Sequence, residues 1–336
     1  MNFAAFLIRR LILMAVVLFG VACIVFVIAH LIPADPVGAL LGGNAPAHVV
    51  DEMRAKLGYD QPLIVQFGRF ISGAVRADFG TSLRTNKPVM EDIMYYFPAT
   101  MELALVAIII SIFLGITLGV ISAIHRNKWI DQFSRVFSIL GVSMPVFWIG
   151  LILILVFYFR LDWLPGAGRL SLFTYAPPRV TGMYLFDSAL AGQWSTFFEA
   201  LKHILLPAIV LGYSATASVA RITRASMLDV LRQDYIRTAK AKGLKRKVVT
   251  YRHALKNSLI PTVTIIGLVF GSLLEGAVLT ETVFSWPGLG RYITTGLLSL
   301  DYPSVMGGTL YIAFIYCLAN LIVDIIYALL DPRMRM

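Results

Sequence analysis

The chain has 336 residues, of which 58% are hydrophobic and 14% charged, and its mean hydropathy is +0.78. This composition argues against an ordinary soluble domain, which is nearer half apolar and a quarter charged, and excludes a disordered chain or a small disulfide scaffold. The two cysteines, Cys23 and Cys317, lie far apart in apolar runs, outside any redox or metal-ligand spacing. The net charge of +10 leaves open a nucleic-acid partner, which the placement of the basic residues has to decide.

Six apolar stretches are long enough to cross a bilayer, whose hydrocarbon core takes about 20 helical residues. In chain order, spans are expected at about 11–32, 99–124, 133–159, 204–220, 259–280 and 304–330. The first begins with basic residues like a secretory signal, but its apolar region runs for about 22 residues where a signal has about 7–15. We interpret it as a permanent anchor. The predicted fold class is all-α: a polytopic membrane protein with six transmembrane helices in a single domain.

The distribution of Lys and Arg predicts how the chain is oriented. With six spans, one side of the membrane receives 18 basic and four acidic residues. The other side, made of the loops 33–98, 160–203 and 281–303, receives 11 basic and 12 acidic residues. Basic loops are retained on the cytoplasmic side. We therefore expect both termini and the loop 221–258 to be cytoplasmic, and the other three loops to be periplasmic.

The loop 221–258 carries 11 of the 29 basic residues. The run is tethered between two spans and lacks the interleaved aromatic residues that stack on bases, so nucleic acid is not the expected partner. Its pattern predicts a short helix, Tyr235–Lys242, with Asp234 as N-cap and Gly243 at the C′ position. One face of a second, amphipathic helix follows, marked by Leu244, Val248, Tyr251, Leu255 and Leu259.

These two helices fit a surface that docks into another protein. A helical hairpin lying on anionic lipid headgroups is the alternative, because basic amphipathic helices also bind membrane surfaces.

Gly267, Gly271 and Glu275 form a row at four-residue spacing on the fifth span. Small residues at this spacing pack transmembrane helices together, so Glu275 is expected to face the protein interior. An acid within the membrane is a functional candidate by default, and a structural hydrogen bond to a neighbouring helix is the alternative. For Glu102 and Asp324, which lie near span ends, a structural use is favoured.

Three prolines, Pro145, Pro207 and Pro261, are expected to break or kink their helices. Pro145 is the deep one, and irregular backbone at that depth is tolerated where it borders a cavity. Met144 and Phe147 beside it would offer an apolar lining. The candidate translocation path or gate is therefore formed by Met144, Pro145, Phe147, Gly271 and Glu275.

Motifs for catalysis are missing from the sequence. There is no phosphate-binding GxxxxGK[ST] loop, so the chain is not expected to bind ATP. The five histidines form no metal-ligand pattern, and no serine lies in a nucleophile elbow. We predict that the chain is not an enzyme and holds no cofactor or metal.

The segment Asp234–Leu244, followed by His253–Asn257 and Pro261, resembles the cytoplasmic coupling loop of permease subunits of ABC importers. The resemblance is closest to the peptide branch, whose members include dipeptide, oligopeptide, glutathione and nickel permeases. The wider family has Glu-Ala-Ala, three residues and then Gly, whereas Arg237 stands here in place of the Glu. Further similar stretches are Leu57–Leu63, Asp78–Gly80, Pro98–Leu103, Thr280–Arg291 and Asp301–Pro303.

The segment Leu170–Lys202 is similar to an insertion of dipeptide-type permeases. The resemblance thus implies a type I ABC importer permease fold in the bacterial inner membrane, moving dipeptides or short oligopeptides by alternating access. It implies four partners in the membrane complex: a second homologous permease chain, two ABC ATPase subunits that bind ATP and Mg, and a periplasmic peptide-binding protein. The implied ATPase-coupling helix comprises Tyr235, Ile236, Arg237, Thr238, Ala239, Lys240, Ala241, Lys242 and Gly243.

Two alternatives remain at this stage. One is an ABC permease for nickel, haem or glutathione. The other is a stand-alone ion-coupled transporter or channel in which Glu275 titrates.

Overall fold

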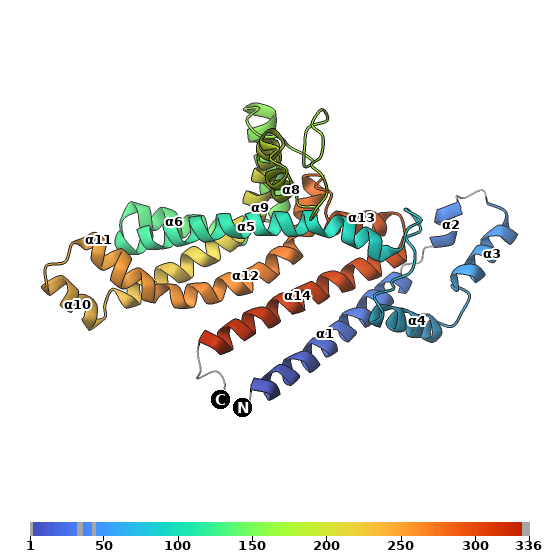
Figure 1. The fold of residues 1–336 in the computed structure, drawn as a ribbon, viewed down its shortest axis with the longest axis horizontal. Helices are drawn as coiled ribbons and strands as arrows, with labels where there is room; N and C mark the ends of the chain where they lie inside the picture. Colours follow the sequence, from blue (N-terminus) through green and yellow to red (C-terminus); the bar gives the residue numbers. More distant parts are fainter. Residues whose placement is uncertain (1–2, 32–35, 42–44, 331–336) are drawn as a thin grey trace.

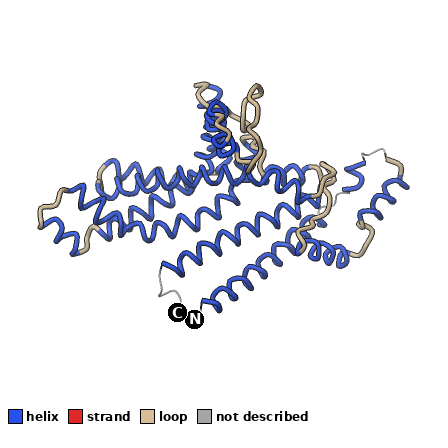
Figure 2. Tube along the Cα trace, in the orientation of Figure 1, coloured by secondary structure: helices blue, strands red, loops and turns tan. Residues whose placement is uncertain are grey.

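The computed structural model describes residues 3–31, 36–41 and 45–330. Ile32, at the predicted end of the first span, and residues 331–336 lie outside the described residues. Within them the chain is helical, and its loops gather at the two ends and in one projecting lobe (Figure 2). The strand-like pairing in this part of the chain is limited to an isolated antiparallel bridge between Thr81 and Pro88.

Five helices are long and apolar enough to cross a membrane. They are α1 (Phe3–Leu31), α5 (Val89–Ile124), α9 (Trp194–Val230), α12 (Leu255–Val283) and α14 (Tyr302–Leu330). A sixth span is formed when α6 (Trp129–Ser143) is taken together with α7 (Val146–Leu153) and the π-helical η1 (Ile154–Arg160). Within the described residues the all-α architecture is therefore confirmed, with five long apolar helices and one bent pair that supplies the sixth span when it is taken as one.

The remaining helices are short and lie at the ends of the bundle or in the lobe (Figure 1). One group of them precedes α5 or follows α12, and comprises α2 (Pro36–Leu41), α3 (Ala47–Leu57), α4 (Leu63–Val75) and α13 (Leu289–Leu298). The lobe contains α8 (Tyr184–Leu190). The opposite end of the bundle carries α10 (Asp234–Ala241), α11 (Arg246–Val248) and η2 (Val249–Ala254). We call these two ends of the bundle the α13 end and the α10 end.

The sixth span is broken at Met144–Pro145, where the two halves meet at 111°. Met144 is extended (φ −87°, ψ 135°), as expected for a residue that precedes proline. Pro145 lacks an N–H group to continue the helical hydrogen bonds, so α7 starts anew after it. The predicted break is thus present at Pro145. By contrast, α9 and α12 continue through Pro207 and Pro261, so these prolines do not break their helices, and the alternative of a kink stays a prediction there.

The centre of the bundle is formed by α5, α9 and α12. Small residues allow α5 and α9 to approach closely: a Cβ on Gly115 would lie 2.7 Å from the Cβ of Val219, and one on Gly119 would lie 2.6 Å from the Cβ of Thr223. Leu103 is fully buried in the apolar cluster between these helices. Since lipid supplies little hydrophobic drive for helix association, this close fit is what holds the helices together.

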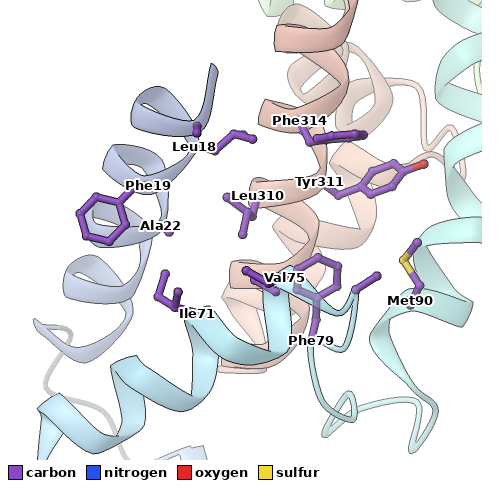
Figure 3. A pocket seen from close by; sticks show the side chains of 13 residues that line it. Leu18, Phe19, Ala22, Ile71, Val75, Phe79, Met90, Leu310, Tyr311 and Phe314 are labelled. Atoms are coloured by element: carbon purple, nitrogen blue, oxygen red, sulfur yellow. The ribbon is translucent and has the colours of Figure 1, made fainter. Parts of the chain in front are cut away.

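The helices α1 and α14 run side by side at the edge of the bundle (Figure 1). A cavity of about 550 Å³ lies between them and α4. Its walls are apolar side chains, among them Ile71, Leu310 and Phe314 (Figure 3). None of the predicted site residues lines this cavity. Apart from the Tyr311 hydroxyl its lining side chains are apolar, so it is a poor environment for a charged substrate and is not a candidate for the translocation path.

Candidate functional site

The helix α10 lies at the far end of the bundle, held there by two apolar side chains (Figure 1). Ile236 is fully buried and Ala239 is 7% exposed, both in a cluster with residues of α5, α9 and η2. The neighbouring residues Tyr235, Arg237 and Lys240 are exposed. A single turn of the helix therefore anchors it, and the rest of its surface is open to a partner.

The end of α10 is a Schellman motif. Gly243 has φ +73°, and its N–H donates to the carbonyl of Lys240 while that of Leu244 donates to the carbonyl of Ala239. The prediction of a left-handed glycine at this position is confirmed. The prediction for the other end is wrong: α10 begins with Asp234, whose side chain caps no backbone N–H, and Gln233 precedes it. In the first turn the Asp234 carboxylate pairs with Arg237 at 3.4 Å, on the exposed surface.

The apolar face predicted after Gly243 is not the buried one. Tyr251 is 55% exposed, and the buried side chains are Ala254, Ser258 and Thr262, one position or more around the helix. Small side chains are buried because α12 approaches α9 closely, with the hydroxyls of Thr262 and Thr223 3.2 Å apart. Of the predicted face, Val248, Leu255 and Leu259 are half-buried, and Leu244 and Tyr251 are exposed.

A hydrogen bond joins α10 to α12. The side-chain amide of Asn257 donates to the Tyr235 hydroxyl at 2.8 Å. A displacement of α10 would therefore be passed on to the start of a membrane-spanning helix, both through this bond and through the buried contacts of Ile236.

The predicted path residues near the break lie on different surfaces. Met144 lines an apolar groove of about 410 Å³ together with Trp148 of α7 and Tyr213 of α9. Phe147, which is 45% exposed, and Pro145 do not line it and are open to the surroundings.

The prediction that Glu275 faces the interior of the chain is wrong, since the residue is exposed. Gly267 packs against Val323 of α14, and Gly271 is buried against the ring of Tyr316. A four-residue step turns an α-helix about 40° past a full turn, because one turn takes 3.6 residues. Two steps carry Glu275 about 80° away from the contact with α14.

The buried acid of α12 is Glu281, which the sequence analysis placed in a loop. Its carboxylate is fully buried and accepts hydrogen bonds from the Thr100 hydroxyl at 2.5 Å and from the Arg291 N–H at 3.0 Å. A Cβ on Gly288 would overlap this carboxylate. The group thus joins α5, α12 and α13. In the sequence, the Thr280–Arg291 motif could have indicated this buried acid, because it combines a glutamate with closely spaced glycines.

A second buried carboxylate, Glu102 on α5, joins the lobe to the bundle. It forms an ion pair with Arg169 at 2.6 Å and accepts the Leu185 N–H at the same distance. The guanidinium of Arg169 also lies 3.5 Å from the centre of the Tyr184 ring. The favoured structural use of Glu102 is consistent with these contacts, as is that of Asp324, which pairs with Arg10 at 3.0 Å.

Within the lobe, the carboxylate of Asp187 on α8 binds the segment that precedes this helix. Burial raises the pKa of this carboxyl, but the backbone and hydroxyl of Thr181 and the N–H groups of Gly182 and Val180 donate to it, so its pKa lies below the ordinary value.

Asp301 is a further buried carboxylate that joins distant parts of the chain. It accepts hydrogen bonds from the Ser82 hydroxyl at 2.6 Å and the Leu83 N–H at 3.1 Å, which ties the loop before α5 to the start of α14.

Among the described residues, no three His, Cys, Asp or Glu side chains lie close enough to hold a metal ion. The buried carboxylates have structural partners. The class of protein that these features define is a multi-pass helical membrane protein with an anchored, largely exposed helix at one end.

The chain belongs to the family of binding-protein-dependent transport system inner membrane components, whose model matches residues 115–336. A model for the N-terminal part of the same membrane components matches residues 3–104.

Curated relatives match along almost their whole length. The chain is 46% identical to a probable D,D-dipeptide transport system permease protein of Escherichia coli (strain K12), covering 99% of this chain and 98% of the relative. It is 45% identical to a dipeptide transport system permease protein of Alkalihalophilus pseudofirmus, covering 98% and 99%. A glutathione transport system permease protein of Escherichia coli O1:K1 is 38% identical, with 98% of both chains covered.

The family establishes that this chain is a multi-pass inner-membrane permease subunit of an ABC importer, not an enzyme, and that it works in a complex with other subunits. The alternatives of a stand-alone transporter and of a nickel or haem permease are not favoured.

Proposed function

We propose that this permease moves dipeptides, or short oligopeptides, across the inner membrane by alternating access. The observation that carries this proposal is similarity over almost the full length to relatives named for dipeptide transport, at 46% and 45% identity against 38% for the glutathione permease.

In this proposal the surface of α10 from Tyr235 to Gly243 sits in a cleft of an ATPase subunit, and two such subunits bind the ATP and Mg. The anchoring of Ile236 and Ala239, with the rest of the helix exposed, supports this role. ATP-driven closure of the ATPases would move α10, and the Asn257–Tyr235 hydrogen bond would pass the motion to α12.

A second, homologous permease chain would cover the open face of α12. Glu275 is exposed there and has no partner among the described residues. A carboxylate facing lipid is strongly unfavourable, so this face is better explained by another subunit or by water in a shared path. Met144, Pro145, Phe147, Gly271 and Glu275 would lie along or beside that path, with Gly271 acting through its packing on α14.

The α13 end would receive a periplasmic peptide-binding protein. Buried carboxylates hold its loops in place, through Glu281 and Asp301. A binding protein needs a docking surface of fixed shape, because ordering mobile loops on binding lowers affinity.

The proposal is tested with the complex purified gently from its native membrane. Mass spectrometry should find this chain with a second six-span permease and two ATPase subunits. In proteoliposomes supplied with the binding protein, uptake of a labelled L,L-dipeptide should require ATP inside the vesicles. An unlabelled D,D-dipeptide and glutathione serve as competitors. ATP-independent uptake, or isolation of the chain without an ATPase, would contradict the proposal, and stronger competition by glutathione would reassign the substrate.

A further inference from the structure

A groove of about 420 Å³ runs between α6 and α9 near the α10 end. It is separate from the surface of α10 and from the apolar groove beside Met144. Apart from two alanines, it is lined by three arginines, three serines and two larger aliphatic side chains: Arg135, Arg221, Arg224, Ser134, Ser138, Ser143, Ile139 and Val142.

The positive charge of this groove is mostly uncompensated. The charge of Arg224 is compensated, because its guanidinium donates to both carboxylate oxygens of the buried Asp131 at 2.7 and 2.9 Å. Arg135 and Arg221 are exposed, and neither has an acidic partner among the described residues. Two guanidinium groups thus face the same groove with free donors, which match the oxygens of a phosphate group in a fork geometry.

Along α6 the charged group of the groove lies nearer the membrane surface than the two aliphatic groups, with Ser138 and Ser143 between and beyond them. On α6, Arg135 lies nearest the α10 end, and Ile139 and Val142 lie one and two turns deeper. At 1.5 Å per residue, Val142 is about 10 Å further toward the membrane centre than Arg135. A phospholipid has the same order, with its phosphate at the surface and its acyl chains inside. This match holds whichever side of the membrane the α10 end occupies.

We propose that this groove binds one anionic phospholipid, with its phosphate on Arg135 and Arg221 and an acyl chain along Ile139 and Val142. The two unpaired positive charges favour an anionic over a zwitterionic lipid. They also argue against a transported dipeptide as the occupant. A dipeptide carries an ammonium group as well as a carboxylate, but no acidic residue of the described chain lines the groove, and the nearby Asp131 already binds Arg224.

The test is a lipid titration of the intact complex, purified with its own subunits, monitored by native mass spectrometry. Phosphatidylglycerol is compared with phosphatidylcholine on the parent protein and on the double variant Arg135→Gln/Arg221→Gln. The control variant, Arg126→Gln/Lys128→Gln, removes the same charge from exposed residues that do not line the groove. Arg224 is left intact in both, so that its buried ion pair is preserved.

The parent should retain phosphatidylglycerol in preference to phosphatidylcholine. The double variant should bind phosphatidylglycerol about 25-fold more weakly, because each basic residue at a membrane surface contributes about fivefold, and the control should change binding less than about twofold. Equal retention by the parent and the double variant would overturn the proposal. So would loss of a subunit from the double variant, which assigns the arginines to a protein contact, or displacement of the lipid by a dipeptide, which assigns them to the substrate. The binding measurement does not depend on transport, so its failure is distinct from that of the proposed function.

Discussion

Replacing Arg169 by Met should destabilise the chain because it leaves a carboxylate buried without its counter-ion. The Arg169 and Glu102 side chains are 8% and 4% exposed, and their nitrogen and oxygen atoms lie 2.6 Å apart. In the variant, Glu102 retains the Leu185 N–H as its hydrogen-bond donor. Methionine fills much of the space over the Tyr184 ring, so the loss is chiefly one of charge.

Removing one partner of a buried ion pair costs about 3–5 kcal/mol, whereas replacing both partners by groups of similar size is often nearly neutral. The double variant Arg169→Met/Glu102→Gln removes both charges, and the glutamine oxygen still accepts the Leu185 N–H. It should therefore lie within about 2 kcal/mol of the parent. The expected result is that adding Glu102→Gln restores the stability that Arg169→Met removes.

The assay is the apparent Tm of the purified complex, read from a fluorescence melt. A loss of 3–5 kcal/mol corresponds to roughly 6–10 °C at about 2 °C per kcal/mol for a chain of this size. As a matched control, Arg10→Met breaks the Arg10–Asp324 pair, whose side chains are 42% and 22% exposed, and should change stability by no more than about 1 kcal/mol. The reasoning is refuted if the double variant is less stable than Arg169→Met, or if Arg169→Met melts with the parent.

Gly243→Val should uncouple ATP hydrolysis from dipeptide uptake, because a β-branched residue at φ +73° costs about 1–2 kcal/mol and alters the end of α10. Gly192→Val carries the same backbone strain (φ +67°), also in open space, but in the lobe, so its ratio of hydrolysis to uptake should stay at the parent value. Gly288→Ala forces a Cβ onto the Glu281 carboxylate and should lower the yield of folded complex several-fold, as measured by size-exclusion chromatography. The lowered pKa of Asp187 stabilises the folded state above the ordinary carboxyl pKa, and this contribution is lost as the pH falls below about 4. Asp187→Asn should therefore show a smaller drop in Tm than the parent between pH 5 and pH 3, and an equal drop would exclude this carboxyl as the cause.

The features that could be predicted are those that depend on local sequence. The apolar runs predict the helices because a bilayer requires continuous helical hydrogen bonding. The left-handed Gly243 follows from the covalent geometry of one residue. These features depend on a few neighbouring residues, so no tertiary contact is needed to infer them. Proline geometry is not sufficient in the same way, because the helix breaks at Pro145 but continues through Pro207 and Pro261.

The orientation of side chains around a helix could not be predicted in the same way. The four-residue spacing of Gly267, Gly271 and Glu275 predicts one packed face of the helix, but the contact with α14 ends before Glu275. The apolar periodicity that includes Tyr251 marked the exposed face and not the buried one, because the packing of α12 on α9 selects small residues. In a membrane protein, apolar periodicity does not distinguish a packed surface from one facing lipid or a partner, since all of them are apolar.

The partners of the buried carboxylates could not be predicted for a related reason, and the placement of these groups bears on how the permease moves. Glu281, Glu102 and Asp301 each bind groups more than 60 residues away in sequence, a relation that no local pattern contains. All three lie toward the α13 end, where they hold the loops, the lobe and the nearby ends of α5 and α14 together. At the α10 end the buried carboxylate of Asp131 joins α5, α6 and α9 in the same way, through Ser122 and Arg224, whereas α10 itself is held by two apolar side chains and one hydrogen bond. A charge buried with several donors resists displacement much more strongly than a small apolar contact. Movement imposed on α10 is therefore expected to shift α10 and the start of α12 before it disturbs the carboxylate contacts at either end.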